Sequence, residues 1–130
     1  NKISRVGSDK EIKVNVRILA ATNKDLKAEI SNGNFREDLF HRLNVIPIKV
    51  PSLNERRDDI PVLVNYFLEL ICNDQGLPLK TIKNDALVLL QEINWTGNIR
   101  ELRNIIERLI ILSGNDITAK DVKTYTNIHN

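Results

Sequence analysis

The stretch that decides the helical part of this chain is GNIRELRNIIERLI, residues 97–110. Its apolar residues recur every three or four positions, which predicts an amphipathic helix. Asn98 stands where an N-cap belongs, and Glu101 follows three residues later, which is the spacing of a capping box. We therefore expect the helix to begin at this motif and to end at Ser113-Gly114.

A second copy of the motif occurs earlier in the chain, as GNFRE over residues 33–37. Both copies predict a helix whose second position is an arginine, Arg36 in one and Arg100 in the other. A cation beside the positive end of the helix dipole is disfavoured by about 0.3–1 kcal/mol. We interpret the two arginines as candidate anion-binding residues. The alternative is a pair of ordinary caps with solvated arginines.

The bulk properties exclude several classes of protein. At 130 residues, 42% hydrophobic and 28% charged, the chain has the composition of a globular domain. Its 19 basic and 17 acidic residues are too evenly balanced to predict nucleic-acid binding. The single Cys72 rules out an intrachain disulfide and favours a reducing compartment. No apolar run has the length of a membrane span, so no membrane partner is expected.

Residues 1–50 are predicted to be α/β. Their apolar spacing indicates one strand and then two short helices, at about residues 12–20, 24–30 and 35–43. The apolar segment 45–50 contains Pro47, which has no N–H to donate, so we expect an edge strand or a strand end there. These strands are too few to close a sheet. The chain is therefore expected to be a fragment of a larger domain.

Residues 51–130 are predicted to be a small all-α bundle. A turn-rich linker over 51–57 precedes the helices, which are expected at about 58–74, 84–93 and 99–112, with a last short helix that Thr118 caps.

Polar residues after the first predicted strand form one candidate site. Thr22 and Asn23 follow the carboxyl end of that strand, where ligands collect in open α/β sheets. An amide at this position can orient a water against a phosphate. The alternative for Asn23 is an N-cap of the helix that follows.

The arginines have structural alternatives as well. Arg36 and Arg42 are six residues apart, which places them about 120° apart around a helix. A pair between Asp38 and Arg42, at i and i+4, would be sufficient to explain Arg42. For Arg100 the alternative is a solvated face that also carries an ion pair between Arg103 and Glu107.

Other kinds of site are not supported by the sequence. Two histidines and one cysteine do not make a convincing zinc site, and no metal site is predicted. No phosphate loop of the form G-x-x-x-x-G-K-[ST] occurs. We therefore do not expect these 130 residues to hydrolyse ATP alone.

Four segments, in order, resemble motifs of the sigma-54-dependent transcriptional activators, a branch of the AAA+ ATPases. VRILAATN (16–23) is similar to the fourth strand and first sensor, and FREDLFHRLNV (35–45) resembles the arginine-finger helix. PSLNERRDDI (51–60) is similar to the linker P-x-L-R-x-R-x-x-D-I that leads into the lid. WTGNIREL (95–102) resembles the second sensor, W-P-G-N-[VI]-R-E-L. The segment NIIERL (104–109) is weakly similar to nitrogen-regulation response regulators of the NtrX type.

The resemblance implies a fold and a set of catalytic residues. Residues 1–50 would be the C-terminal end of an AAA+ P-loop ATPase core, and residues 51–130 its helical lid. Thr22 and Asn23 would form the first sensor, which reads the γ-phosphate and the attacking water. Arg36 and Arg42 would reach the nucleotide of a neighbouring subunit, with Arg42 as the finger itself.

The resemblance also implies nucleotide contacts in the lid. Arg100 would sense the nucleotide of its own subunit, and Arg57 and Ile60 of the linker would lie beside it. Two positions depart from the family pattern, because Asn54 replaces Arg in the linker and Thr96 replaces Pro in the second sensor.

The implied parent protein is a cytoplasmic response regulator of a two-component system. It would use ATP with Mg²⁺ and assemble as a homo-oligomeric ring that remodels sigma-54 RNA polymerase. It would contact DNA only through a C-terminal domain outside this sequence. One alternative is a nucleotide-independent helical module that binds a protein or DNA. Another is a different AAA+ branch, such as a helicase loader or a protease-linked unfoldase.

Overall fold

The computed structural model describes residues 2–126. The chain forms two compact units, residues 1–49 and 50–130. Its elements, in order, are β1 (Lys2–Ser4), β2 (Glu11–Lys13), α1 (Leu26–Ser31), α2 (Glu37–Leu43), the 3₁₀-helix η1 (Leu53–Asp59), α3 (Ile60–Asp74), β3 (Thr81–Ile82), α4 (Asn84–Glu92), α5 (Asn98–Leu112), β4 (Asp116–Ile117) and α6 (Ala119–Tyr125).

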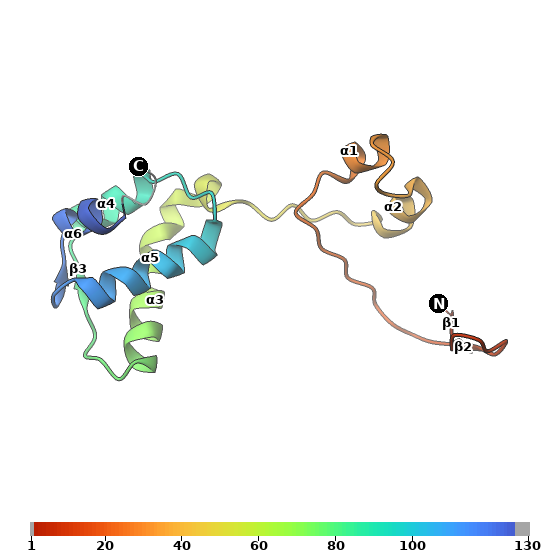
Figure 1. Cartoon of the computed structure of the whole chain (residues 1–130), viewed down its shortest axis with the longest axis horizontal. Helices are drawn as coiled ribbons and strands as arrows, with labels where there is room; N and C mark the ends of the chain where they lie inside the picture. Colours follow the sequence, from red (N-terminus) through yellow and green to blue (C-terminus); the bar gives the residue numbers. More distant parts are fainter. Residues whose placement is uncertain (1, 127–130) are drawn as a thin grey trace. The chain divides into compact units, whose positions relative to one another are not determined.

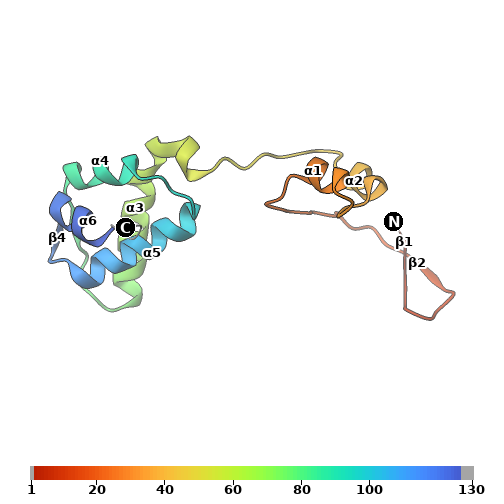
Figure 2. The same cartoon turned by 45° about the horizontal axis from the view of Figure 1, so that its top comes forward.

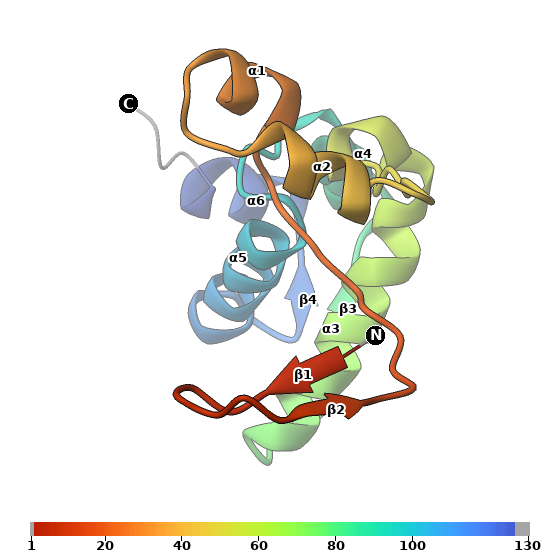
Figure 3. The ribbon, with the colours of Figure 1, turned by 90° about the vertical axis from the view of Figure 1, so that its right-hand side faces the viewer.

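The first unit begins with a hairpin in which β1 pairs antiparallel with β2 (Figure 3). Gly7, at φ 81°, lies in the connecting turn. The strand predicted over residues 12–20 is wrong beyond Lys13, because β1 offers only three residues for pairing. Residues 14–22 contain no helix or strand, and neither does the segment 45–50 that was expected to be an edge strand.

The helix predicted over residues 24–30 is confirmed as α1. Hydrogen bonds at both of its ends use residues next to the helix, and those at its C-terminal end involve Gly33 and Asn34. Asp25 caps α1 by accepting from the N–H groups of Lys27 and Ala28 at 3.1 and 3.3 Å. At the other end, Gly33 N–H donates to Ile30 O and Asn34 N–H donates to Glu29 O. With Gly33 at φ 76°, this is a Schellman motif.

The predicted capping box at Asn34 is therefore wrong, because this residue ends α1 instead of starting α2. The second helix begins at Glu37, and Arg36 occupies its N-cap position. Arg36 is thus one residue before the first turn, not at the second helical position.

The second unit is a helical bundle with a continuous core, and its predicted helices are confirmed. In Figures 1 and 2, α5 crosses α3, and α4 lies alongside α6. The predicted turn-rich linker forms η1. The core is built from buried apolar side chains of η1, the helices, β4 and the loop before α5: Leu53, Ile60, Val64, Phe67, Leu68, Ile71, Cys72, Ala86, Leu90, Trp95, Leu102, Ile105, Ile106, Leu109, Ile110, Ile117 and Val122.

The bundle also contains a short pair of strands and a capped last helix. A parallel pair, β3 with β4, joins two segments for which no strand is predicted from the sequence. The predicted cap of the last helix is confirmed, because Thr118 Oγ1 accepts from Asp121 N–H at 3.2 Å and Asp121 Oδ2 accepts from Thr118 N–H at 3.0 Å. No helix within residues 2–126 is both long and apolar enough to span a bilayer.

Candidate functional site

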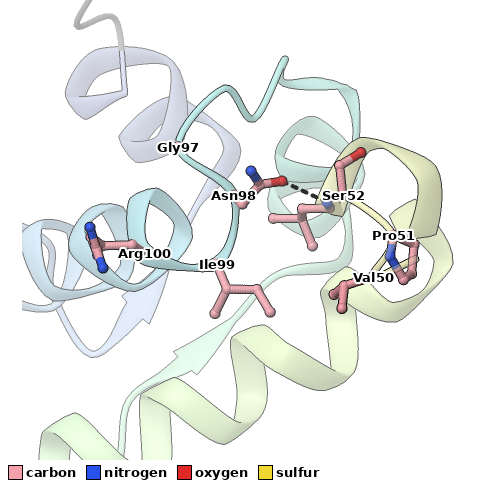
Figure 4. Close-up of a pocket in the computed structure, with 8 residues that line it drawn as sticks. Val50, Pro51, Ser52, Gly97, Asn98, Ile99 and Arg100 are labelled. Atoms are coloured by element: carbon pink, nitrogen blue, oxygen red, sulfur yellow. Dashed lines mark hydrogen bonds between the residues drawn. The ribbon is translucent and has the colours of Figure 1, made fainter. Parts of the chain in front are cut away.

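The start of α5 borders a pocket of about 460 Å³. Residues 50–53, where the chain enters the second unit, line one side of it, and residues 97–100 line the other. Figure 4 shows these two segments facing each other, with Ile99 and Arg100 leaving the helix start in different directions. The pocket thus lies between the incoming chain and the helix that carries Arg100.

Two asparagines link the chain at residues 53–54 to the chain at residues 95–98 by reciprocal hydrogen bonds. Asn98 Oδ1 accepts from the backbone N–H of Leu53 at 2.9 Å, shown as the dashed line in Figure 4. Asn54 Oδ1 accepts from the backbone N–H of Trp95 at 2.8 Å. Each asparagine therefore satisfies a backbone donor of the opposite segment. We refer to Leu53, Asn54, Trp95 and Asn98 as the asparagine clamp.

A second group of contacts holds the end of α4 against η1. Arg57 Nη1 donates to the carbonyl oxygens of Gln91 and Ile93, the latter at 2.7 Å, and Gln91 Nε2 donates back to Arg57 O at 3.2 Å. The buried indole of Trp95 donates from Nε1 to Leu90 O at 2.9 Å. The last carbonyls of a helix have no partner within it. At α4, Arg57 and Trp95 supply these partners.

The backbone at the start of α5 differs from the predicted capping box. Asn98 has φ 52°, a left-handed conformation that asparagine tolerates better than most residues. Its side chain bonds Leu53, so it does not cap α5. Glu101 keeps half of the box, because its Oε2 accepts from Gly97 N–H at 2.6 Å. A Cβ on residue 97 would lie 2.7 Å from Glu101 Cβ, so glycine is required at this close approach.

Arg100 is the third residue of α5, not the second as predicted, and its side chain is exposed. It also lines a second pocket of about 360 Å³, which Asn104 and Arg108 extend along the same helix. Within residues 2–126 the structure gives Arg100 no hydrogen bond or ion pair. The ion pair expected between Arg103 and Glu107 does not form either.

The two arginines of α2 differ in their contacts. Arg36 forms a two-point ion pair with Asp38, with Nη2–Oδ2 at 2.7 Å and Nε–Oδ1 at 3.0 Å. The predicted pair between Asp38 and Arg42 is therefore wrong, because the carboxylate is already occupied. Arg42 is exposed and has no hydrogen bond or ion pair to any described residue.

The two predicted first-sensor residues lie in an exposed segment before α1. Thr22 Oγ1 accepts from Lys24 N–H at 3.1 Å, which forms a local turn. Asp25, not Asn23, caps α1, so the N-cap alternative for Asn23 is wrong. Its amide is exposed and is not used by the helix.

The two linker residues predicted to contact nucleotide are engaged in the lid itself. Ile60 is completely buried in the core. The Arg57 guanidinium donates hydrogen bonds to backbone carbonyls at the end of α4. It also donates to Asn54 Oδ1 at 3.2 Å. Neither side chain presents a free group to a ligand in this structure. Asn54, which replaces the family arginine, also forms its hydrogen bonds within the lid, to Asn94 and Trp95.

Arg100 and the asparagine clamp therefore lie together in the second unit, residues 50–130. Asn23, Arg36 and Arg42 lie in the first unit, residues 1–49. Sequence reasoning missed the clamp. The only local signal was the capping-box spacing at Asn98, which pointed to the wrong partner. No cluster of three or more His, Cys, Asp or Glu side chains that is able to hold a metal occurs in the described part of the chain.

Comparison with known families assigns both units. Residues 1–49 match the sigma-54 interaction domain, and residues 54–129 match the AAA+ ATPase lid domain. This chain belongs to the sigma-54 activators. It is the C-terminal part of their AAA+ domain, with a small α/β end followed by the helical lid, which confirms the predicted fold class.

Individual sigma-54 activators are similar over most of the chain. The nitrogen assimilation regulatory protein NtrX of Azorhizobium caulinodans is 50% identical over 117 residues, which cover 90% of this chain and 26% of that protein. The Nif-specific regulatory protein of Azotobacter vinelandii is 46% identical over 129 residues, which cover 99% of this chain and 24% of that protein. The chain thus spans about a quarter of the curated relatives it matches.

The fold is similar to a solved sigma-54 activator. The crystal structure of NtrX from Brucella abortus in complex with ATP matches with a TM-score of 0.81 at 45% identity, over 92% of this chain and 28% of that one. A second crystal structure of the same protein, in complex with ADP, matches with a TM-score of 0.80 at 46% identity.

Proposed function

We propose that the chain serves an ATPase that assembles as a homo-oligomeric ring, remodels sigma-54 RNA polymerase and thereby opens promoters. The observation that carries the proposal is the unengaged guanidinium of Arg42 on α2, in a chain of the sigma-54 activator family. The similar NtrX structures in complex with ATP and ADP support ATP as the substrate.

Arg42 is the better candidate for the arginine finger. A finger must bring its charge to the phosphoryl group of a neighbouring subunit, where negative charge develops during transfer. Arg42 is exposed and free to do so, whereas Arg36 would first have to leave Asp38. We assign Arg36 to holding the N-terminal end of α2 in place. An arginine supplied in trans is worth about 10³–10⁵ in rate in GTPases.

The other site residues act within one subunit in this proposal. Asn23, whose amide no helix uses, would orient the attacking water with Thr22 as the first sensor. Arg100 would contact the phosphates as the second sensor. In this proposal Mg²⁺ would be held by the nucleotide and by residues outside this chain. When bound, it would neutralise phosphate charge.

The chain would act as part of a larger domain in the cytoplasm. Apolar residues in the segments 16–19 and 45–50 are largely exposed, up to 87% at Leu19, which fits packing against further parts of that domain. DNA contact would come from a separate C-terminal domain. The 130 residues alone contain no phosphate loop, and we expect them to show no ATP turnover.

The deciding experiment measures ATP hydrolysis by the native-length protein over a range of protein concentrations. We expect specific activity to rise with concentration and to fall at least about 100-fold in Arg42→Ala, with nucleotide binding retained. Arg36→Ala should lose less than Arg42→Ala. Arg5→Ala, which removes another exposed arginine, is the matched control.

Two results would reject the proposal. One is a specific activity independent of concentration together with normal turnover by Arg42→Ala. The other is appreciable hydrolysis by the 130-residue chain alone, which would place the phosphate site within it.

A further inference from the structure

We infer that Asn54 and Asn98 are positioning residues that set the direction of Arg100 and couple it to the incoming chain. This inference rests on the proposed contact between Arg100 and the nucleotide. The asparagine clamp joins two segments that are 45 residues apart in sequence, at Leu53 and Asn98. Its second bond, from Trp95 N–H to Asn54, is made 2.8 Å across the same junction.

The conformation of Asn98 makes the start of α5 depend on how this residue is held. A residue at φ 52° breaks the regular path into a helix, so the direction of the first turn of α5 depends on how this residue is held. Its side chain is held by the Leu53 N–H at 2.9 Å. Arg100 follows two residues later, before α5 has made a full turn, and its direction therefore follows that of Asn98.

Arg100 has no hydrogen bond or ion pair of its own among the described residues. Its side chain is exposed and forms no bond with the described residues, so no contact of its own sets its direction. Glu101 restrains the helix start only locally, through Gly97 N–H. The two asparagine side chains accept the hydrogen bonds that tie this start to η1, the first element after the connection from residues 1–49.

The asparagine clamp also couples Arg100 to the connecting segment. Any displacement of residues 50–54 pulls on Asn98 and Trp95, and any displacement of Arg100 pulls on Leu53 in return. Binding of a phosphate group at Arg100 and movement of the connecting segment are thereby linked, and such a linkage is reciprocal. Asn54 makes the coupling stiffer, because Asn94 Oδ1 accepts from its Nδ2 at 2.9 Å.

The test uses the native-length protein and the non-hydrolysable ATP analogue AMP-PNP, with binding measured by calorimetry. Asn98→Gly keeps the left-handed backbone but removes the acceptor, and Asn54→Ala removes the other acceptor. Each should raise the dissociation constant about 2- to 10-fold, the range set by one hydrogen bond. Asn54→Asp keeps the acceptor for Trp95 N–H but loses the Nδ2 donor to Asn94 Oδ1, so it should weaken binding less than Asn54→Ala. Asn73→Ala, an exposed asparagine on α3, is the matched control.

A double-mutant cycle separates positioning from mere stabilisation of the fold. Combined with Arg100→Ala, neither clamp variant should weaken AMP-PNP binding further, because the group that the clamp directs is gone. Thermal unfolding, followed by circular dichroism, should show that every variant is folded at the temperature of the binding measurement.

The outcomes distinguish this inference from the proposed function. If Arg100→Ala weakens binding but the clamp variants bind normally, or weaken it equally in the Arg100→Ala background, the positioning role is wrong and the second sensor stands. If Arg100→Ala itself binds AMP-PNP as the unchanged protein does, both the sensor and the positioning role are wrong.

Discussion

Asp38 binds both Nε and Nη2 of Arg36, at 3.0 and 2.7 Å, and so leaves Arg42 without the helix partner that i,i+4 spacing offers it. A planar guanidinium and a carboxylate match at two points, which makes this arrangement stronger than a single-point ion pair. The two arginines of α2 are thereby distinguished by their contacts. Arg36 is engaged within its own subunit, and Arg42 is available to another molecule.

The first prediction concerns Asp38→Asn, which weakens the ion pair without changing the size of the side chain. Because both partners are solvent-exposed, we expect the free energy of unfolding to change by less than about 1 kcal/mol. ATP turnover by the native-length protein should stay within about twofold, since Arg42 keeps its charge and position. A tenfold loss of turnover would show that the Arg36–Asp38 pair belongs to the catalytic machinery.

The second prediction concerns Arg57, which the family resemblance placed beside the nucleotide. Arg57→Lys loses the fork that reaches the carbonyls of Gln91 and Ile93. We expect it to destabilise the 130-residue chain by about 1–3 kcal/mol in urea unfolding, because part-buried carbonyls lose their donor. The affinity of the native-length protein for AMP-PNP should remain within about twofold, since this guanidinium is used inside the lid. Weaker binding with unchanged stability would instead favour a direct nucleotide contact.

The third prediction concerns Trp95, whose indole is buried and bonds Leu90 O at 2.9 Å. Trp95→Phe keeps an aromatic ring but leaves that carbonyl unsatisfied and the volume partly empty. The expected loss of stability is about 1–3 kcal/mol. Urea unfolding followed by far-ultraviolet circular dichroism provides the measurement, because the substitution removes the only tryptophan. An unchanged midpoint would mean that the hydrogen bond contributes nothing.

The fourth prediction concerns the cap of α6. Thr118→Ala removes the hydroxyl that accepts from Asp121 N–H, so we expect a loss of about 0.5–2 kcal/mol in the unfolding of the 130-residue chain. Thr118→Ser keeps this hydroxyl and is the matched control, with a loss well below that of alanine. Equal losses in the two variants would assign the effect to the methyl group instead.

The sequence alone determined the features that depend on neighbouring residues. Three- and four-residue apolar spacing located α3, α4 and α5, because a helix in a bundle needs one apolar face toward the core. The cap at Thr118 was predictable, because donor and acceptor are three residues apart. The motifs of the sigma-54 activators could also be identified from the sequence, in order along the chain.

Only the tertiary structure decided which partner each polar group takes when several are available. GNFRE and GNIRE have the same spacing, yet Asn34 ends α1 whereas Asn98 bonds Leu53, 45 residues away. Asp38 also pairs with Arg36 and not with Arg42, although here the partner is only two residues away, at the start of α2. A local pattern lists the possible hydrogen bonds of a side chain. Which of them forms depends on donors that folding brings close, and these contacts set where Arg42 and Arg100 are free to act.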